Sequence, residues 1–140
     1  MAYWLGKYET HTFSWDEQVA PGKKGEPWSG VRNHAAKLNL MAMKTGELAF
    51  FYHSNIGKEI VGVVEIAKEA YPDPTAEAGS PWVAVTTVAK ASFKTPVTLA
   101  QVKADPKLAE MALLKFSRLS VQPVTATEWA HICKLGGVKP

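Results

Sequence analysis

The chain has a single cysteine and lacks the segments that direct proteins to a membrane or out of the cell. Because Cys133 has no second cysteine to pair with, an intrachain disulfide is excluded and a reducing compartment is favoured. The first residues lack the charged start and apolar run of a signal peptide, and no stretch approaches the roughly 18 apolar residues of a membrane-spanning helix. We therefore expect a cytoplasmic protein with no membrane partner.

Motifs for nucleotide cofactors and for metals are also missing. The 10 glycines are scattered, and neither G-x-G-x-x-G nor G-x-x-x-x-G-K-[ST] occurs. The histidines have no metal-ligand spacing; they are His11, His34, His53 and His131. No order of residues typical of a catalytic triad is visible. The sequence therefore predicts no cofactor, no metal site and no catalytic residue.

Length and composition are those of a folded protein. With 140 residues, 46% hydrophobic and 21% charged, the chain fits one domain over residues 1–140 that buries a single core. A net charge of +3 and a pI near 9.0 are compatible with an anionic partner, although many lysine-rich proteins share this balance. Composition leaves the partner open, and we expect a monomer.

The order of expected elements favours a mixed sheet with helices at its ends. Strand patterns cover residues 3–7, 47–52, 60–70, 82–93 and 119–124. Helices are expected from Ser14 to about residue 21, from 31 to 43, after Thr98, after Asp105 and from 125 to 136, with a loop over 22–27 and a tight turn over 55–58. Because strands and helices do not alternate regularly, a curled sheet or small barrel is favoured over a doubly wound parallel sheet.

Both arginines lie in the two least ordinary stretches of the chain. Arg32 belongs to residues 28–33 and Arg118 to residues 117–124, whereas the other basic residues are all lysine. A guanidinium presents a planar fork of donors suited to a phosphate, a carboxylate or a base edge. In the expected first turn of a helix, Arg32 needs an anionic partner, which is either a carboxylate of this chain or a phosphate.

A third stretch combines aromatic and polar side chains. The apolar Phe50 and Phe51 lead into Tyr52, His53 and Ser54, which are expected where a buried strand reaches the rim of the sheet. Strand alternation sends Tyr52 and Ser54 to one face and His53 to the other, so all three line one pocket only if the strand twists or ends there. A lone histidine is more often structural than functional.

Together these stretches resemble the EVE domain family, which is related to the ASCH and YTH domains. The matching motifs span nearly the entire chain: Tyr3-Trp4-Leu5, Phe13-Ser14-Trp15, Trp28 with Gly30-Val31-Arg32-Asn33, Phe50-Phe51-Tyr52-His53-Ser54, Ile60-Val61-Gly62, Tyr71-Pro72-Asp73-Pro74-Thr75, and Arg118-Leu119-Ser120-Val121 with Pro123-Val124. The chain departs from the family pattern at Tyr8, Ser29, Ala35 and Lys37.

The resemblance implies an α+β fold, a PUA-like mixed β-pseudobarrel with flanking helices, and a pocket for a flipped, modified nucleobase. It implies that Trp28, Ser29, Gly30, Val31, Arg32 and Asn33 form one pocket wall and that Tyr52, His53 and Ser54 close another side. Ser14 and Trp15 would lie near the rim, and Arg118, Ser120 and Gln122 would approach from the late strand.

The leading hypothesis is therefore a non-enzymatic module that binds modified DNA or RNA. Trp28, with Trp15 as a second candidate, stacks on the base, and Arg32 holds a phosphate or a base edge. Hydrogen bonds are offered by Asn33, Ser54 and Ser120. Two alternatives remain open. One is a small enzyme that acts on RNA or a nucleobase derivative, with His53 or a nearby carboxylate as its base, and the other is a protein-interaction module without a ligand.

Overall fold

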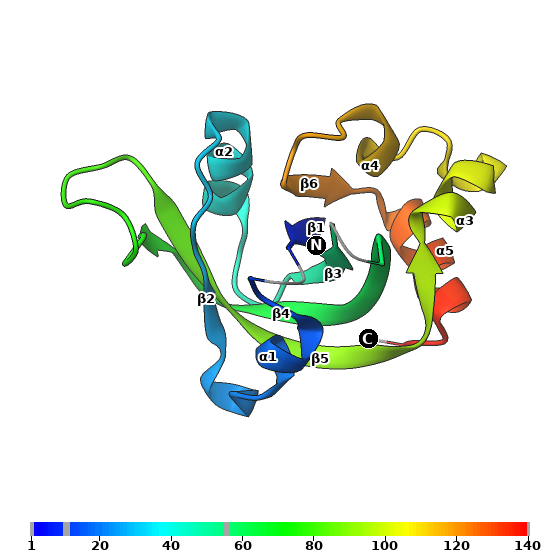
Figure 1. The fold of residues 1–140 in the computed structure, drawn as a ribbon, viewed down its shortest axis with the longest axis horizontal. Coiled ribbons are helices and arrows are strands. Elements are labelled where there is room, and N and C mark those ends of the chain that lie inside the picture. The colour runs from blue at the N-terminus through cyan, green and yellow to red at the C-terminus, as the bar shows by residue number, and fades with distance from the viewer. Residues whose placement is uncertain (1, 10–11, 55–56, 140) are drawn as a thin grey trace.

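Six strands form one mixed sheet in the computed structural model, which describes residues 2–9, 12–54 and 57–139 (Figure 1). The elements are β1 (Tyr3–Tyr8), α1 (Trp15–Val19), η1 (Gly22–Lys24), β2 (Glu26–Trp28), α2 (His34–Ala42), β3 (Leu48–His53), β4 (Glu59–Pro72), β5 (Val83–Thr98), α3 (Leu99–Ala104), η2 (Pro106–Leu108), α4 (Ala112–Lys115), β6 (Val121–Val124) and α5 (Ala126–Gly136). The strand order is β2-β5-β4-β3-β1-β6, with β1 parallel to β3 and the other pairs antiparallel. The predicted α+β class with a mixed sheet is confirmed.

The long β4–β5 pair gives the sheet its curl. Its register shifts at several places between Ile60 and Tyr71, and such irregularities bend a strand and increase its twist. The two strands are longer than the predicted strands over residues 60–70 and 82–93, and β4 continues to Pro72. The pairing of β4 with β3 ends at Glu65, so the last part of β4 pairs with β5 on one side only. Pro72, which has no N–H to donate, is tolerated in such an edge position.

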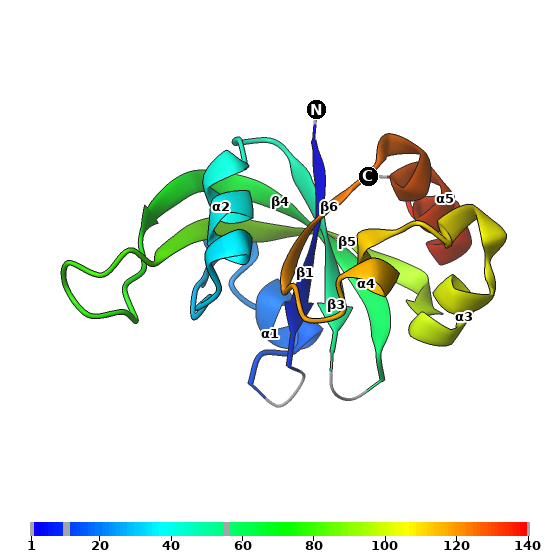
Figure 2. The same cartoon turned by 90° about the horizontal axis from the view of Figure 1, so that it is seen from above.

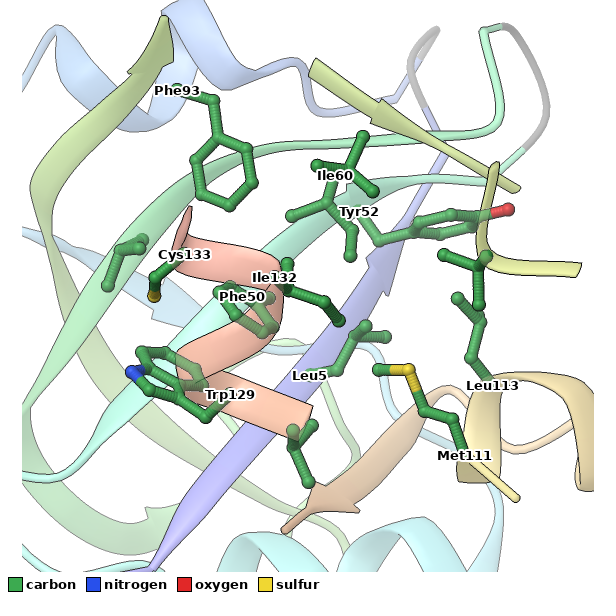
Figure 3. Close-up of a cluster of buried hydrophobic side chains, with 14 of the residues drawn as sticks. Leu5, Phe50, Tyr52, Ile60, Phe93, Met111, Leu113, Trp129, Ile132 and Cys133 are labelled. Carbon is green, nitrogen blue, oxygen red and sulfur yellow. The ribbon is translucent and has the colours of Figure 1, made fainter. Parts of the chain in front are cut away.

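Strand β3 separates two clusters of buried side chains because its residues alternate between the faces of the sheet. Phe50 and Tyr52 belong to what we call the C-terminal cluster, which packs against α5 and includes Trp129 and Ile132 (Figure 3). Phe51 belongs to the other, the N-terminal cluster, whose members are Trp4, Tyr8, Trp15, Trp28, Val31, Ala36, Leu40, Met43, Ala49, Phe51, Val64, Ile66, Val85 and Val121. Helix α2 lies on one side of β1 and β6, and α3, α4 and α5 lie on the other (Figure 2).

Two local predictions before α2 are wrong. Residues 22–27 are not a loop throughout, because η1 is followed by β2, in which Trp28 pairs with Val85 of β5. Helix α2 begins at His34 rather than at residue 31, because Asn33 is extended and its side chain accepts a hydrogen bond from the Ala36 amide. Arg32 therefore precedes the helix and does not lie in its first turn.

The predicted helix starts at Ser14, Thr98 and Thr125 are confirmed, since each of these residues forms a capping box. In the predicted turn over 55–58, residues 55 and 56 lie outside the described part of the chain. Among the described residues, no helix has the length and apolar character needed to cross a membrane.

Candidate functional site

A cavity of about 450 Å³ opens where β1, β2 and the segment before α2 meet. We call it the Trp28 cavity. Its lining residues are Lys7, Tyr8, Glu9, Thr12, Phe13, Glu26, Pro27, Trp28, Ser29, Gly30, Val31, Arg32 and Ser120. Of the predicted site residues, the structure brings these six together at one cavity: Trp28, Ser29, Gly30, Val31, Arg32 and Ser120.

The apolar wall of this cavity is a stack of aromatic rings. The Tyr8 ring lies parallel to Phe51, with centroids 3.9 Å apart, and Trp28 lies 5.4 Å from Tyr8 on centroids. The indole of Trp28 crosses Gly6, where a Cβ atom would come within 2.3 Å of it. Because Trp28 is only 4% exposed, it offers part of its ring, and not an open face, to a ligand.

The hydroxyl of Tyr8 is a buried polar group without a partner among the described residues. Burial raises the pKa of Tyr8 well above its ordinary value, so the hydroxyl keeps its proton at neutral pH. Tyr8 therefore lines the cavity while its buried hydroxyl keeps an unused capacity for a hydrogen bond.

Arg32 is held by Asp73 at the edge of the cavity. Its Nη1 lies 3.0 Å from Asp73 Oδ2, its Nη2 donates to Thr75 Oγ1 at 3.3 Å, and its Cζ lies 5.8 Å from the Trp82 ring centroid. The Asp73 side chain is fully buried, whereas that of Arg32 is 40% exposed. The partner of Arg32 is therefore a carboxylate of this chain, one of the two possibilities left open above.

Asp73 also fixes the backbone that leads from β2 to α2. Its carboxylate accepts hydrogen bonds from the amides of Gly30, at 2.8 Å, and Thr75, at 2.7 Å. Burial by itself would raise the pKa of Asp73, but the hydrogen bonds from Thr75, Gly30 and Arg32 outweigh it and lower the pKa to about 2. The segment after Trp28 is thus anchored to the β4–β5 turn by a carboxylate that stays ionised.

The predicted second side of the pocket is not part of the cavity lining, because those side chains have structural partners. His53 Nε2 accepts a hydrogen bond from the Trp15 amide at 3.1 Å, and burial lowers the pKa of His53 despite the charges of Glu59 and Asp16. Ser54 Oγ donates to the Tyr8 carbonyl at 3.1 Å. His53 and Ser54 therefore hold the backbone of Trp15 and of Tyr8, and Tyr8 in turn lines the cavity.

Ser14 and Trp15, predicted at the rim, are also occupied by packing. Ser14 caps α1. The Trp15 indole donates to Ser92 Oγ at 3.0 Å and lies on Gly62, where a Cβ atom would meet it at 2.3 Å. Neither residue lines the Trp28 cavity.

Tyr52 and Gln122, which the resemblance placed at the pocket, are core residues outside the cavity lining. Tyr52 is 3% exposed and points into the C-terminal cluster (Figure 3), whereas Trp28 belongs to the N-terminal cluster. Gln122 is fully buried, and its Nε2 donates to the carbonyls of Phe116 and Leu119 at 3.0 and 2.9 Å. Strand alternation explains Tyr52, since it separates this residue from Phe51.

Arg118 and Asn33 line a second hollow, of about 500 Å³, which we call the Arg118 groove. Its lining residues are Asn33, Ala35, Lys115, Phe116, Ser117, Arg118 and Leu119. It lies between the start of α2 and the segment after α4, two elements that face each other in Figure 2. Arg118 is exposed and forms no ion pair with any described residue.

No group of three or more histidine, cysteine, aspartate or glutamate side chains within the described residues is placed to hold a metal ion. His11 lies outside those residues.

Sequence reasoning missed the cavity residues from the first strand and the loop that follows it, notably Lys7, Tyr8 and Phe13. The sequence signal for Tyr8 is its departure from the family pattern. Phe116 was also missed, although it is an aromatic residue two positions before Arg118.

Fold and cavity together define a PUA-like domain, and the EVE domain pattern matches residues 2–135. The chain belongs to the EVE domain family. A solved protein from Rhodopseudomonas palustris is 62% identical, with a TM-score of 0.92 over 98% of this chain and 94% of that one.

A human relative has been solved with nucleic acid. The structure of human THYN1, thymocyte nuclear protein 1, in complex with DNA containing 5-methylcytosine is 33% identical, with a TM-score of 0.89 over 100% of both chains. A YTH domain from Zygosaccharomyces rouxii, solved with N6-methyladenosine RNA, is 14% identical, with a TM-score of 0.59 over 99% of this chain and 86% of that one. The YTH likeness shows the fold alone.

Proposed function

We propose that this protein binds nucleic acid that carries a modified base and that the Trp28 cavity receives this base. The observation that carries the proposal is the human relative in complex with 5-methylcytosine DNA, because that relative matches this chain over its full length. A cavity of about 450 Å³ with an aromatic wall supports it, since flipped bases are held against aromatic side chains and by hydrogen bonds to their edges.

The charges of the cavity also suit a base better than a phosphate. Lys7 and Arg32 are balanced by Glu9 and Glu26, and both cations are engaged. Arg32 pairs with Asp73, and Lys7 Nζ donates to the Ser117 carbonyl. Trp28 and Tyr8 supply the apolar wall, while Ser29 and Ser120 remain as polar groups for a base edge.

Binding without catalysis is part of this proposal. The enzyme alternative required His53 or a nearby carboxylate as a base, but His53 Nε2 is occupied by the Trp15 amide and Asp73 by Arg32. Accordingly, His53→Ala is expected to alter stability. Neither the wild type nor this variant is expected to turn over RNA or nucleobase derivatives. A monomeric state and a cytoplasmic location stay predictions.

The test is a comparison of oligonucleotides that differ in one base. Fluorescence anisotropy would measure binding to strands and duplexes with 5-methylcytosine, 5-hydroxymethylcytosine or N6-methyladenine and to unmodified copies. We expect one modified ligand to bind at least about ten times more tightly, an advantage of about 1.4 kcal/mol. Equal affinity for all ligands would contradict the proposal.

A pair of matched variants locates the site. Trp28 and Trp129 are 4% and 5% exposed and lie in opposite clusters. Trp28→Phe should reduce the preference for the modified base, because it shrinks the apolar wall that part of the indole gives the cavity, and Trp129→Phe should leave the preference unchanged. Thermal unfolding of both variants gives the loss of stability that the two substitutions share.

A further inference from the structure

The Arg118 groove adjoins the Trp28 cavity along a shared wall. On the α2 side, Arg32 lines the cavity and Asn33 the groove, and on the β6 side Ser120 lines the cavity and Leu119 the groove. These residues are direct neighbours in the chain, and successive Cα atoms are about 3.8 Å apart, so no residue lies between the two linings on either side. A hydrogen bond from Lys7 Nζ to the Ser117 carbonyl also joins them.

The groove differs from the cavity in its charge. Its charged lining residues are Lys115 and Arg118, both basic, with no acidic residue among those that line it. Lys115 pairs with Glu110, but both side chains are exposed, at 50% and 77%, and such pairs contribute little and exchange readily. The arginine of the groove is therefore without an ion pair among the described residues, whereas the arginine of the cavity is paired with the buried Asp73.

An exposed aromatic ring lies beside these cations. Phe116 is 58% exposed, in contrast to Trp28. It immediately follows α4, and its carbonyl is held, like that of Leu119, by the buried amide of Gln122. The backbone of the groove is thus fixed before any ligand arrives, while the ring of Phe116 remains accessible.

We propose that the Arg118 groove holds the nucleotide next to the modified base on the same strand. Phe116 stacks on the neighbouring base, and Arg118, with Lys115, binds the phosphate that links it to the base in the Trp28 cavity. A volume of about 500 Å³ suits one nucleotide, and an aromatic platform combined with basic side chains is how single strands are held without reading their sequence. This inference rests on the proposed function, because the Trp28 cavity sets where the strand begins.

A cycle of two changes, one in the protein and one in the ligand, tests the stacking contact. The protein change is Phe116→Ala, and the ligand change replaces the nucleotide on either side of the modified base by an abasic residue. For wild type, the abasic residue on one side should weaken binding about tenfold, within the range measured for base–aromatic stacking. For Phe116→Ala, binding to the intact strand should weaken by the same factor, and the abasic residue should cause no further loss.

Leu38→Ala, which removes another exposed apolar side chain, 61% exposed and outside both hollows, is the control and should not change binding. The inference is overturned if Phe116→Ala binds the intact strand as wild type does, or loses equally on intact and abasic strands. Its failure is distinct from that of the proposed function, which fails if wild type does not prefer the modified base. The cycle remains informative in that case, because it can be run on unmodified strands.

Discussion

The two arginines of this chain occupy opposite environments. Arg32 donates to Asp73, Thr75 and the Val31 carbonyl and lies over Trp82, so it ties the end of β2 to the turn between β4 and β5. Arg118 is exposed beside a groove and pairs with no described residue. An identical side chain thus stabilises the site in one place and remains available to a ligand in the other, and the difference lies in a buried carboxylate.

The largest expected effect is the loss of that carboxylate. Asp73→Ala should lower the free energy of unfolding by about 2 to 3 kcal/mol, because the Gly30 and Thr75 amides lose their acceptor; the partial exposure of Arg32 keeps the effect below that of a fully buried pair. Urea unfolding measures it. Glu77→Ala, at an exposed residue near the same turn, is the control and should change stability by no more than about 0.5 kcal/mol. Equal effects would contradict the role assigned to Asp73.

The next effect is a dependence of stability on acid pH. The folded-state pKa of Asp73, about 2, lies below its value of 3.8 in the absence of the fold. The stabilisation is therefore complete above about pH 4 and is lost as the pH falls toward 2, an effect of about 2 kcal/mol. Glu47 and Asp105 also have lowered pKa values, so wild type should lose more than this.

Comparison with Asp73→Asn isolates the contribution of Asp73. This variant starts less stable, and its unfolding free energy should fall less steeply between pH 4 and pH 2, since it has no carboxyl group to protonate there. Parallel curves for the two proteins would show that Asp73 titrates normally.

The sequence predicted the fold and the helix caps better than the site. Alternation and capping residues are local signals, and they placed β3, α1 and α5 within a few residues of their observed bounds. The resemblance identified the segment from Trp28 to Arg32. It also grouped Tyr52 with them, although Phe51 and Tyr52 face opposite sides of one strand.

What the sequence did not reveal depends on pairing between distant segments. The ion pair between Arg32 and Asp73 joins residues 41 positions apart. The position of Tyr8 follows from the parallel pairing of β1 with β3, where Tyr8 lies opposite His53. A periodic pattern of residues along the chain does not predict contacts between such distant segments.

A smaller effect, of opposite sign, is expected on the cavity side. Tyr8→Phe removes a buried hydroxyl that has no partner in the described structure, so stability should stay the same or rise by up to about 1 kcal/mol. Tyr71→Phe is the matched control, because the Tyr71 hydroxyl lies 2.8 Å from Thr86 Oγ1 and its removal should cost about 1 kcal/mol. Thermal unfolding distinguishes the two, and a loss for Tyr8→Phe would mean that its hydroxyl has a partner.

The smallest effect on stability is expected for the substitution of Arg118, which distinguishes the roles of the two arginines most directly. Arg118→Ala should change the free energy of unfolding by no more than about 0.5 kcal/mol, because the side chain is exposed and has no ion pair among the described residues. If Arg118 binds one phosphate, however, its loss should make the slope of log K against log salt shallower by about 0.7 for a single strand and about 0.9 for a duplex.

Arg32→Ala should do the reverse, lowering stability and leaving the salt slope unchanged, because the charge of Arg32 is neutralised by Asp73. Anisotropy titrations at several salt concentrations measure both slopes, and a shallower slope for Arg32→Ala alone would exchange the roles assigned here.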